Sequence, residues 1–143
     1  INIDLLAPVR ATHAALPFLE KSHGSIIHIS SISGLIPSAR TPPYGAVKAA
    51  LVQLTTSQAV RLADKHIRVN CIAPSLTRTP LAAKLTANAQ MADAIAAMHP
   101  LPRLGEAEDI AGLVAFLLSQ DATWMTGQVI GVDGGRSSLR NKG

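Results

Sequence analysis

The stretch GSIIHISS, residues 24–31, is a short apolar run that follows a glycine and ends in two serines. A run of this length without regular polar alternation is typical of a strand in a parallel sheet that is buried on both faces. Two more runs have the same character, IRVNCI at 67–72 and QVIGV at 128–132. Helical patterns separate the three runs. The order helix, strand, helix, strand, helix, strand indicates right-handed crossovers and an α/β fold with a parallel sheet.

Apolar residues at helical spacing predict the three helices. The first covers residues 2–20 and is expected to end near Pro17, because proline breaks the hydrogen-bond ladder. The second begins at Thr41, whose hydroxyl is expected to cap it ahead of two prolines, and runs to about Asp64. The third covers residues 106–119 and has acidic residues at its N-terminal end. Its expected apolar stripe consists of Ile110, Leu113, Val114, Leu117 and Leu118.

Length and composition favour one packed unit. Of the 143 residues, 48% are hydrophobic and 15% charged, so a core is expected and disorder is not. We find no internal repeat and no domain boundary. Three strands make an unusually small sheet for one that is covered on both faces, so residues 1–143 are interpreted as a single partial domain. The chain begins at Ile1 rather than at methionine, which favours the interpretation as a fragment.

Several classes of partner and compartment are not expected. Aromatic residues make up only 3%, and the formal charge of +4 is scattered, so nucleic-acid binding is not predicted. The basic tail, Arg136, Arg140 and Lys142, is expected to be a solvated terminus. No signal peptide or membrane span is recognisable. The single cysteine, Cys71, lies in a strand pattern and predicts a buried thiol, which suits the cytoplasm.

Tyr44 and Lys48 are four residues apart within the second predicted helix, so their side chains leave the same face. A free tyrosine has a pKa of about 10, too high for ready proton exchange at neutral pH. A nearby ammonium group favours the phenolate, and a tyrosine in that setting can act as a general acid or base. The spacing alone is also typical of an ordinary surface pair.

Ser31 stands directly after the first predicted strand. Ligands of open parallel sheets bind beyond the carboxyl ends of the strands, so its hydroxyl is expected where a substrate binds. The following helix brings Tyr44 back to the same rim. Ser30 and Ser33 are competing hydroxyls, which we interpret as caps of local backbone groups in the turn.

With these residues in view, the sequence resembles the short-chain dehydrogenase/reductase family. The run 24–31, followed by YGAVKAA at 44–50, is similar to the family's strand, serine and Tyr-x-x-x-Lys helix at their usual spacing. RVNCIAP at 68–74 resembles the segment before its nicotinamide-contact loop. LPRLG at 101–105, with the predicted helix after it and TGQVIGVDGG at 126–135, resembles its C-terminal block. Four blocks in order cover nearly the whole chain, which predicts the C-terminal part of a Rossmann-like, doubly wound parallel sheet.

The resemblance implies an NAD(P)-dependent oxidoreductase that interconverts an alcohol and a ketone. Tyr44 would exchange the proton with the substrate oxygen. Lys48 would assist Tyr44 and bind the nicotinamide ribose, and Ser31 would hold the substrate oxygen. Asn2 matches an asparagine that supports a water-linked proton relay to the lysine, although a helix cap is the alternative interpretation of a residue so near the start.

The resemblance also implies that residues after the second strand contact the cofactor: Pro74, Ser75, Leu76, Thr77 and Thr79. Thr79 matches a threonine that contacts the carboxamide, and Thr77 is the competing candidate. The family commonly has glycine where this chain has Ser75. Glycine permits close backbone approach, so the fit of the cofactor in this loop is the least secure part of the resemblance.

Two histidines stand outside this set. His28 is interpreted as a hydrogen-bonded histidine on a strand, because no second ligand is spaced to share a metal with it, and no metal site is predicted. Residues 75–100 are Ala-rich and predict an irregular segment that determines substrate choice. His99 lies in this segment and is interpreted as a surface residue, with a place in the substrate pocket as the alternative.

No glycine-rich phosphate loop stands in these residues, nor does the acidic residue that distinguishes NAD from NADP. We therefore expect the segment alone to bind dinucleotide poorly and to be inactive, and its first strand to present an open edge. The resemblance implies a homo-oligomer, a dimer or tetramer, with a small alcohol or ketone as substrate. The alternatives are a truncated, non-catalytic protein that keeps the interaction surfaces, or an epimerase or dehydratase of the related extended group.

Overall fold

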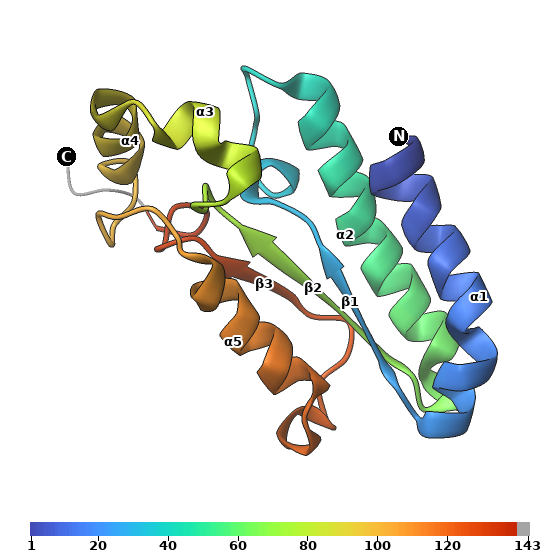
Figure 1. The fold of residues 1–143 in the computed structure, drawn as a ribbon. Helices are drawn as coiled ribbons and strands as arrows, with labels where there is room; N and C mark the ends of the chain where they lie inside the picture. The colour runs from blue at the N-terminus through green and yellow to red at the C-terminus, as the bar shows by residue number, and fades with distance from the viewer. Residues whose placement is uncertain (140–143) are drawn as a thin grey trace.

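The three apolar runs form one parallel sheet in the computed structural model, which describes residues 1–139. Its strands are β1 (Ser25–Ile29), β2 (Arg68–Pro74) and β3 (Val129–Val132). The order is β1-β2-β3, and both pairings are parallel, with Ile29 opposite Ile72 and Cys71 opposite Val129. The predicted α/β fold with three alternating strands is confirmed (Figure 1).

Helices cover both faces of the sheet. Helices α1 (Ala7–Ser22) and α2 (Pro42–Leu62) lie side by side against one face, and α5 (Ala107–Leu118) lies against the other (Figure 1). Successive strand residues point to opposite faces. Ile26 therefore packs with the α1 and α2 cluster, whereas Ile27 packs with the cluster around α5. The central strand β2 is the most buried element and separates the two clusters.

Strand β1 lies at the edge of the described sheet, as predicted. It is less buried than the central strand β2, and Ile29 at its end is 43% exposed. A groove of about 440 Å³ runs between α1, β1 and α2. The backbone groups on the outer side of β1 are thus available to pair with another strand.

The first helix does not end near Pro17. A π-helical turn, η1 (Asn2–Leu6), leads into α1, which continues through Pro17 to Ser22. Pro17 is exposed, so water can bind the carbonyl that its missing N–H leaves free. On the other side of the helix, Leu16 and Leu19 pack against the core, and this packing outweighs the local cost of proline.

Two local features also differ from expectation. The hydroxyl of Thr41 does not cap α2 but lies 2.8 Å from the Ser38 hydroxyl, although a proline does occupy the first turn. The segment 75–100 is not irregular throughout. It contains η4 (Pro80–Ala82), α3 (Ala83–Thr86) and α4 (Ala89–Ala96). The side chain of Asn88 accepts a hydrogen bond from the Met91 N–H at 3.0 Å and caps α4, a signal that the sequence carried.

At the start of helix α5 (Ala107–Leu118) the Glu106 N–H donates to Asp109 Oδ2 at 2.8 Å, and the Asp109 N–H donates to the Glu106 carbonyl at 3.1 Å. Arg103 binds both oxygens of Asp109, at 2.7 and 2.9 Å. These bonds lower the pKa of Asp109 to about 2. The predicted stripe is confirmed except at Leu118, which is 56% exposed because it faces away from the cluster around Leu117.

Polar side chains of β2 attach it to the C-terminal block. Asn70 is fully buried; its amide donates to Met125 O at 2.9 Å and accepts from the Gln128 N–H at 3.0 Å. Arg68 donates to Leu117 O at 2.7 Å, at the C-terminal end of α5, where a cation is favourable. Short 3₁₀ turns complete the described chain: η2 (Ile32–Gly34), η3 (Ala63–Lys65) and η5 (Gln120–Ala122).

Of the predicted basic tail, Arg140 and Lys142 lie outside the described residues. Arg136 is not solvated as expected: it is half-buried, and its guanidinium contacts Met98 Sδ at 3.3 Å. Within residues 1–139, no helix has the length and apolar character needed to cross a bilayer.

Replacing Asn70 by Ala should lower the free energy of unfolding by about 2–4 kcal/mol, because the Gln128 N–H and Met125 O lose their partner and the fully buried Asn70 side chain leaves a void. Urea unfolding measures this loss. Gln128→Ala is the control, because that side chain is exposed, and its effect should stay within about 0.5 kcal/mol. Equal effects of the two substitutions would contradict the proposed attachment of β2.

Candidate active site

Ser31 follows Ser30 just beyond the carboxyl end of β1, the end to which the strand arrow points (Figure 1). It is 9% exposed, and its hydroxyl oxygen accepts from the Ser33 N–H at 3.1 Å, which caps the turn η2. The hydroxyl proton remains available for a ligand. The local capping expected of Ser30 and Ser33 is therefore performed by Ser31, while Ser30 donates to the distant Lys48 O at 2.7 Å.

Two glycines bring the turn η2 against the first turns of α2. A Cβ at Gly34 would lie 2.6 Å from the Lys48 carbonyl carbon, and one at Gly45 would lie 2.9 Å from Ser33 O. Real Cβ atoms essentially never approach so closely, so both positions need glycine. The resulting contact fixes Ser31 relative to the helix that carries Tyr44 and Lys48.

Tyr44 and Lys48 share one face of α2, as predicted. The Lys48 Nζ lies 5.6 Å from the centre of the Tyr44 ring. Tyr44 is 43% exposed, so its hydroxyl is accessible, whereas the Lys48 side chain is only 12% exposed. The pair combines an accessible phenol with a cation held nearby.

Lys48 is held in place by the end of β1 and by the turn η1. Its Nζ donates to Ile29 O at 3.2 Å and lies 3.9 Å from Asp4 Oδ1. Asn2 is exposed, and among the described residues its side chain forms no hydrogen bond with Lys48. Instead its carbonyl accepts the Ala7 N–H that closes the π turn. Asp4 was missed from the sequence, because its contact with Lys48 joins η1 to α2, two segments that are distant in sequence.

The loop after β2 lies beside this group, because β1 and β2 are neighbours and the Ser30 N–H donates to Ile72 O at 2.8 Å. The loop is anchored on both sides. The Ser75 N–H donates to Val132 O at 3.3 Å, and Thr77 forms a bridge with Gly105. The predicted cofactor loop and the predicted catalytic residues thus share one edge of the sheet.

The donor groups of this loop suit a carboxamide. Within residues 1–139, the backbone N–H groups of Leu76 and Thr77 have no hydrogen-bond acceptor. The Thr77 hydroxyl donates to Ser75 O at 3.0 Å. The Thr79 hydroxyl is exposed and only accepts, from the Ala82 N–H at 3.3 Å, so its proton is free to bind a ligand oxygen.

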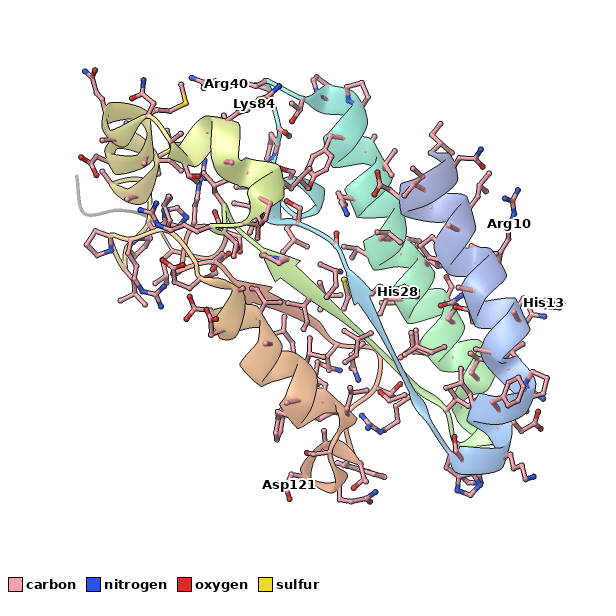
Figure 2. All side chains as sticks on the ribbon, viewed as in Figure 1. Arg10, His13, His28, Arg40, Lys84 and Asp121 are labelled. Carbon is pink, nitrogen blue, oxygen red and sulfur yellow. The ribbon has the colours of Figure 1, made fainter. Side chains whose placement is uncertain are left out.

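His28 and Cys71 stand apart from this chemistry, as predicted. The His28 side chain lies on the face of β1 that α2 covers (Figure 2), with Nε2 2.7 Å from Gln58 Oε1. Cys71 is fully buried, and burial raises the pKa of its thiol. His99 differs from expectation: it is 3% exposed rather than at the surface.

Known proteins share both the sequence and the fold. A family model described as enoyl-(acyl carrier protein) reductase matches residues 1–137. Dehydrogenase/reductase SDR family member 4 of Homo sapiens is 40% identical over 139 residues, which make up 96% of this chain and 50% of that protein. The chain belongs to the short-chain dehydrogenase/reductase family. It spans about half the length of the curated relatives it matches.

Solved structures of short-chain dehydrogenases place the same fold next to dinucleotides. ElxO with NADP bound superposes with a TM-score of 0.88 at 34% identity, covering 95% of this chain and 56% of that one. A 4-hydroxyisoleucine dehydrogenase complexed with NADH gives a TM-score of 0.90 at 30% identity, covering 96% of this chain and 58% of that one. Members of the family with this architecture therefore occur with either dinucleotide.

Replacing Gly34 by Ala should lower the free energy of unfolding by about 1–3 kcal/mol, because the new Cβ would force the turn away from α2. Gly112→Ala is the matched control, since a Cβ there meets no atom within 4 Å and a helix favours alanine by up to about 1 kcal/mol. Urea unfolding of both variants should give changes of opposite sign. A neutral Gly34→Ala would disprove the tight contact.

Proposed function

We propose that this chain carries the catalytic half of an NAD(P)-dependent oxidoreductase that interconverts an alcohol and a ketone. The observation that supports it is the group of Ser31, Tyr44 and Lys48, which β1, η2 and α2 assemble at the carboxyl edge of a parallel sheet. Family membership supports the same reaction class. The activity is proposed for a chain that also holds a glycine-rich phosphate loop, since none stands in these residues.

Tyr44 is proposed to move the proton. In the reducing direction its hydroxyl donates to the ketone oxygen, and in the oxidising direction its phenolate accepts the alcohol proton. Lys48, whose Nζ lies 5.6 Å from the centre of the Tyr44 ring, is proposed to assist this transfer. Because Lys48 is held by Ile29 O, its position does not depend on the substrate.

Ser31 is proposed to hold the substrate oxygen. Its own oxygen is occupied by the Ser33 N–H, which orients the hydroxyl and leaves its proton as the donor. The relay role proposed for Asn2 would need a water molecule, because this side chain forms no hydrogen bond with Lys48 in the described residues. Asp4, 3.9 Å from the lysine nitrogen, is a further polar group on that route.

A nicotinamide dinucleotide is the proposed cofactor, and it would supply or accept the hydride at the substrate carbon. Lys48 would bind its ribose. Residues of the loop after β2 would bind the carboxamide, with Pro74, Ser75, Leu76, Thr77 and Thr79 as the proposed contacts. The free N–H groups of Leu76 and Thr77 and the free proton of Thr79 support this assignment, and they favour Thr79 over Thr77 as the hydroxyl donor. Relatives solved with NADP and with NADH leave both dinucleotides as candidates.

The substrate is proposed to be a small alcohol or ketone, and its choice is expected to depend on residues 75–100, which include α3 and α4. A homo-oligomer, dimeric or tetrameric, and a cytoplasmic location remain predictions from the family resemblance and from the single buried cysteine.

Replacing Tyr44 by Phe should reduce turnover by about 10²- to 10⁴-fold, because the phenol is the proposed proton donor. The assay uses the full-length protein as its native source makes it, with a panel of ketones and either NADPH or NADH. Stability should change little, since the side chain is largely exposed and packing is preserved. Gln53→Ala, on an exposed position of the same helix, is the control and should keep full turnover. Undiminished turnover of Tyr44→Phe would refute the proposed role, and no turnover in the unmodified protein would favour a non-catalytic function.

A further inference from the structure

His99 occupies a buried junction that the reaction as proposed does not use. Its side chain is 3% exposed and lines a cavity of about 280 Å³ together with Ser75 and the segment around Gly134. Both ring nitrogens have partners. Nδ1 lies 2.9 Å from Ile95 O and 3.2 Å from Ala96 O, and Nε2 lies 2.7 Å from Ser75 Oγ.

These contacts define the roles of the two ring nitrogens. A carbonyl oxygen only accepts, so Nδ1 carries a proton and donates it to the C-terminal end of α4. In the neutral ring Nε2 is then an acceptor, and the Ser75 hydroxyl donates to it. The direction of the bond is therefore set by helix α4 rather than by the loop.

Ser75 connects this histidine to the proposed cofactor loop. Its N–H donates to Val132 O on β3, and its carbonyl accepts the Thr77 hydroxyl. The Arg136 guanidinium lies 3.5 Å from the Ser75 hydroxyl oxygen. At this position the family commonly has glycine, which has no side chain to form such a link.

The C-terminal turn closes the other side of the histidine. Gly134 has a φ of +59°, and a Cβ at this residue would lie 3.3 Å from His99 Cβ. The Leu101 N–H donates to Gly134 O at 3.0 Å. Three segments thus meet at His99: the end of α4, the loop after β2 and the turn after β3.

From this junction we propose that His99 is a positioning residue: through Ser75 it holds residues 74–79 in the geometry that binds the nicotinamide end of the dinucleotide, and it ties that loop to α4. The inference rests on the proposed function. The hydrogen bond of Ser75 to His99 limits the motion of the loop. The bond also directs the Ser75 side chain, which stands where the family commonly has glycine, toward His99 at the end of α4.

Two substitutions remove the bond from either side. Ser75→Ala deletes the hydroxyl. His99→Phe keeps a ring of similar volume without nitrogens, and it leaves no orphaned carbonyl, since Ile95 O and Ala96 O also accept the N–H groups of Met98 and His99. His99→Gln is the conservative variant, because its amide oxygen can reach the Ser75 hydroxyl. The matched controls are Gln58→Ala and His28→Phe, which remove a bond of the same 2.7 Å length from another buried histidine.

Two readouts are measured on the full-length protein. The first is the dissociation constant of NADPH and of NADH by titration calorimetry. The second is amide hydrogen exchange of Arg78, whose N–H donates to Gly105 O and so reports whether the loop is attached. Ser75→Ala and His99→Phe should each weaken dinucleotide binding about fivefold and speed Arg78 exchange, and the double variant should be no worse than either single one. His99→Gln should recover most of the affinity, and the controls should change neither readout.

The inference is overturned if the variants at 75 and 99 resemble the controls in both readouts, or if their effects on affinity multiply in the double variant. A positioning role also requires that affinity falls together with faster exchange, so a change in melting temperature alone contradicts it. Failure of the proposed function has a different signature, namely an unmodified full-length protein that binds neither dinucleotide.

Discussion

The hydrogen bond from the Ser30 hydroxyl to Lys48 O is the contact on which the candidate site depends. It joins the end of β1 to the second turn of α2, and the close approach of Gly34 to the same peptide reinforces it. Because Ser31 follows Ser30 directly, the position of its hydroxyl is defined relative to Tyr44 without any contact between these two side chains. Backbone contacts thus set the relative positions of the two side chains.

The central strand β2 connects β1, and with it this contact, to the C-terminal block. Its apolar side chains alternate between the two apolar clusters. Its polar side chains, Arg68 and Asn70, form hydrogen bonds with backbone carbonyl and N–H groups of the C-terminal block. The loop after β2 is consequently attached to both β3 and residue Gly105. Ser31, just beyond β1, and the loop after β2 are thereby held at neighbouring strand ends of one sheet.

The three strands, and the placement of Tyr44 and Lys48 on one helix face, were predictable from the sequence because both follow from local spacing. Apolar runs identified the strands, and the four-residue interval identified the shared face of Tyr44 and Lys48. The errors arose where tertiary contacts decide. Pro17 stays within α1 because Leu16 and Leu19 bury the opposite side. His99 is buried because segments distant in sequence converge on it, and Asp4 meets Lys48 because η1 and α2, also distant in sequence, pack together. None of these contacts has a signature in a window of neighbouring residues.

That irregular turn, η1, carries one residue more than an α-helical turn would, since the Ala7 N–H reaches back five residues to Asn2 O. One residue corresponds to a rotation of about 100° around a helix axis. The residues before Ala7 are therefore out of phase with those of α1, and the turn behaves as a one-residue insertion that left the packed face of α1 undisturbed. Asp4, carried by this turn, lies 3.9 Å from Lys48 Nζ, while Leu16 and Leu19 of α1 stay packed against the core. An irregular turn at the start of a helix can thus add a polar contact without changing the buried face of the helix.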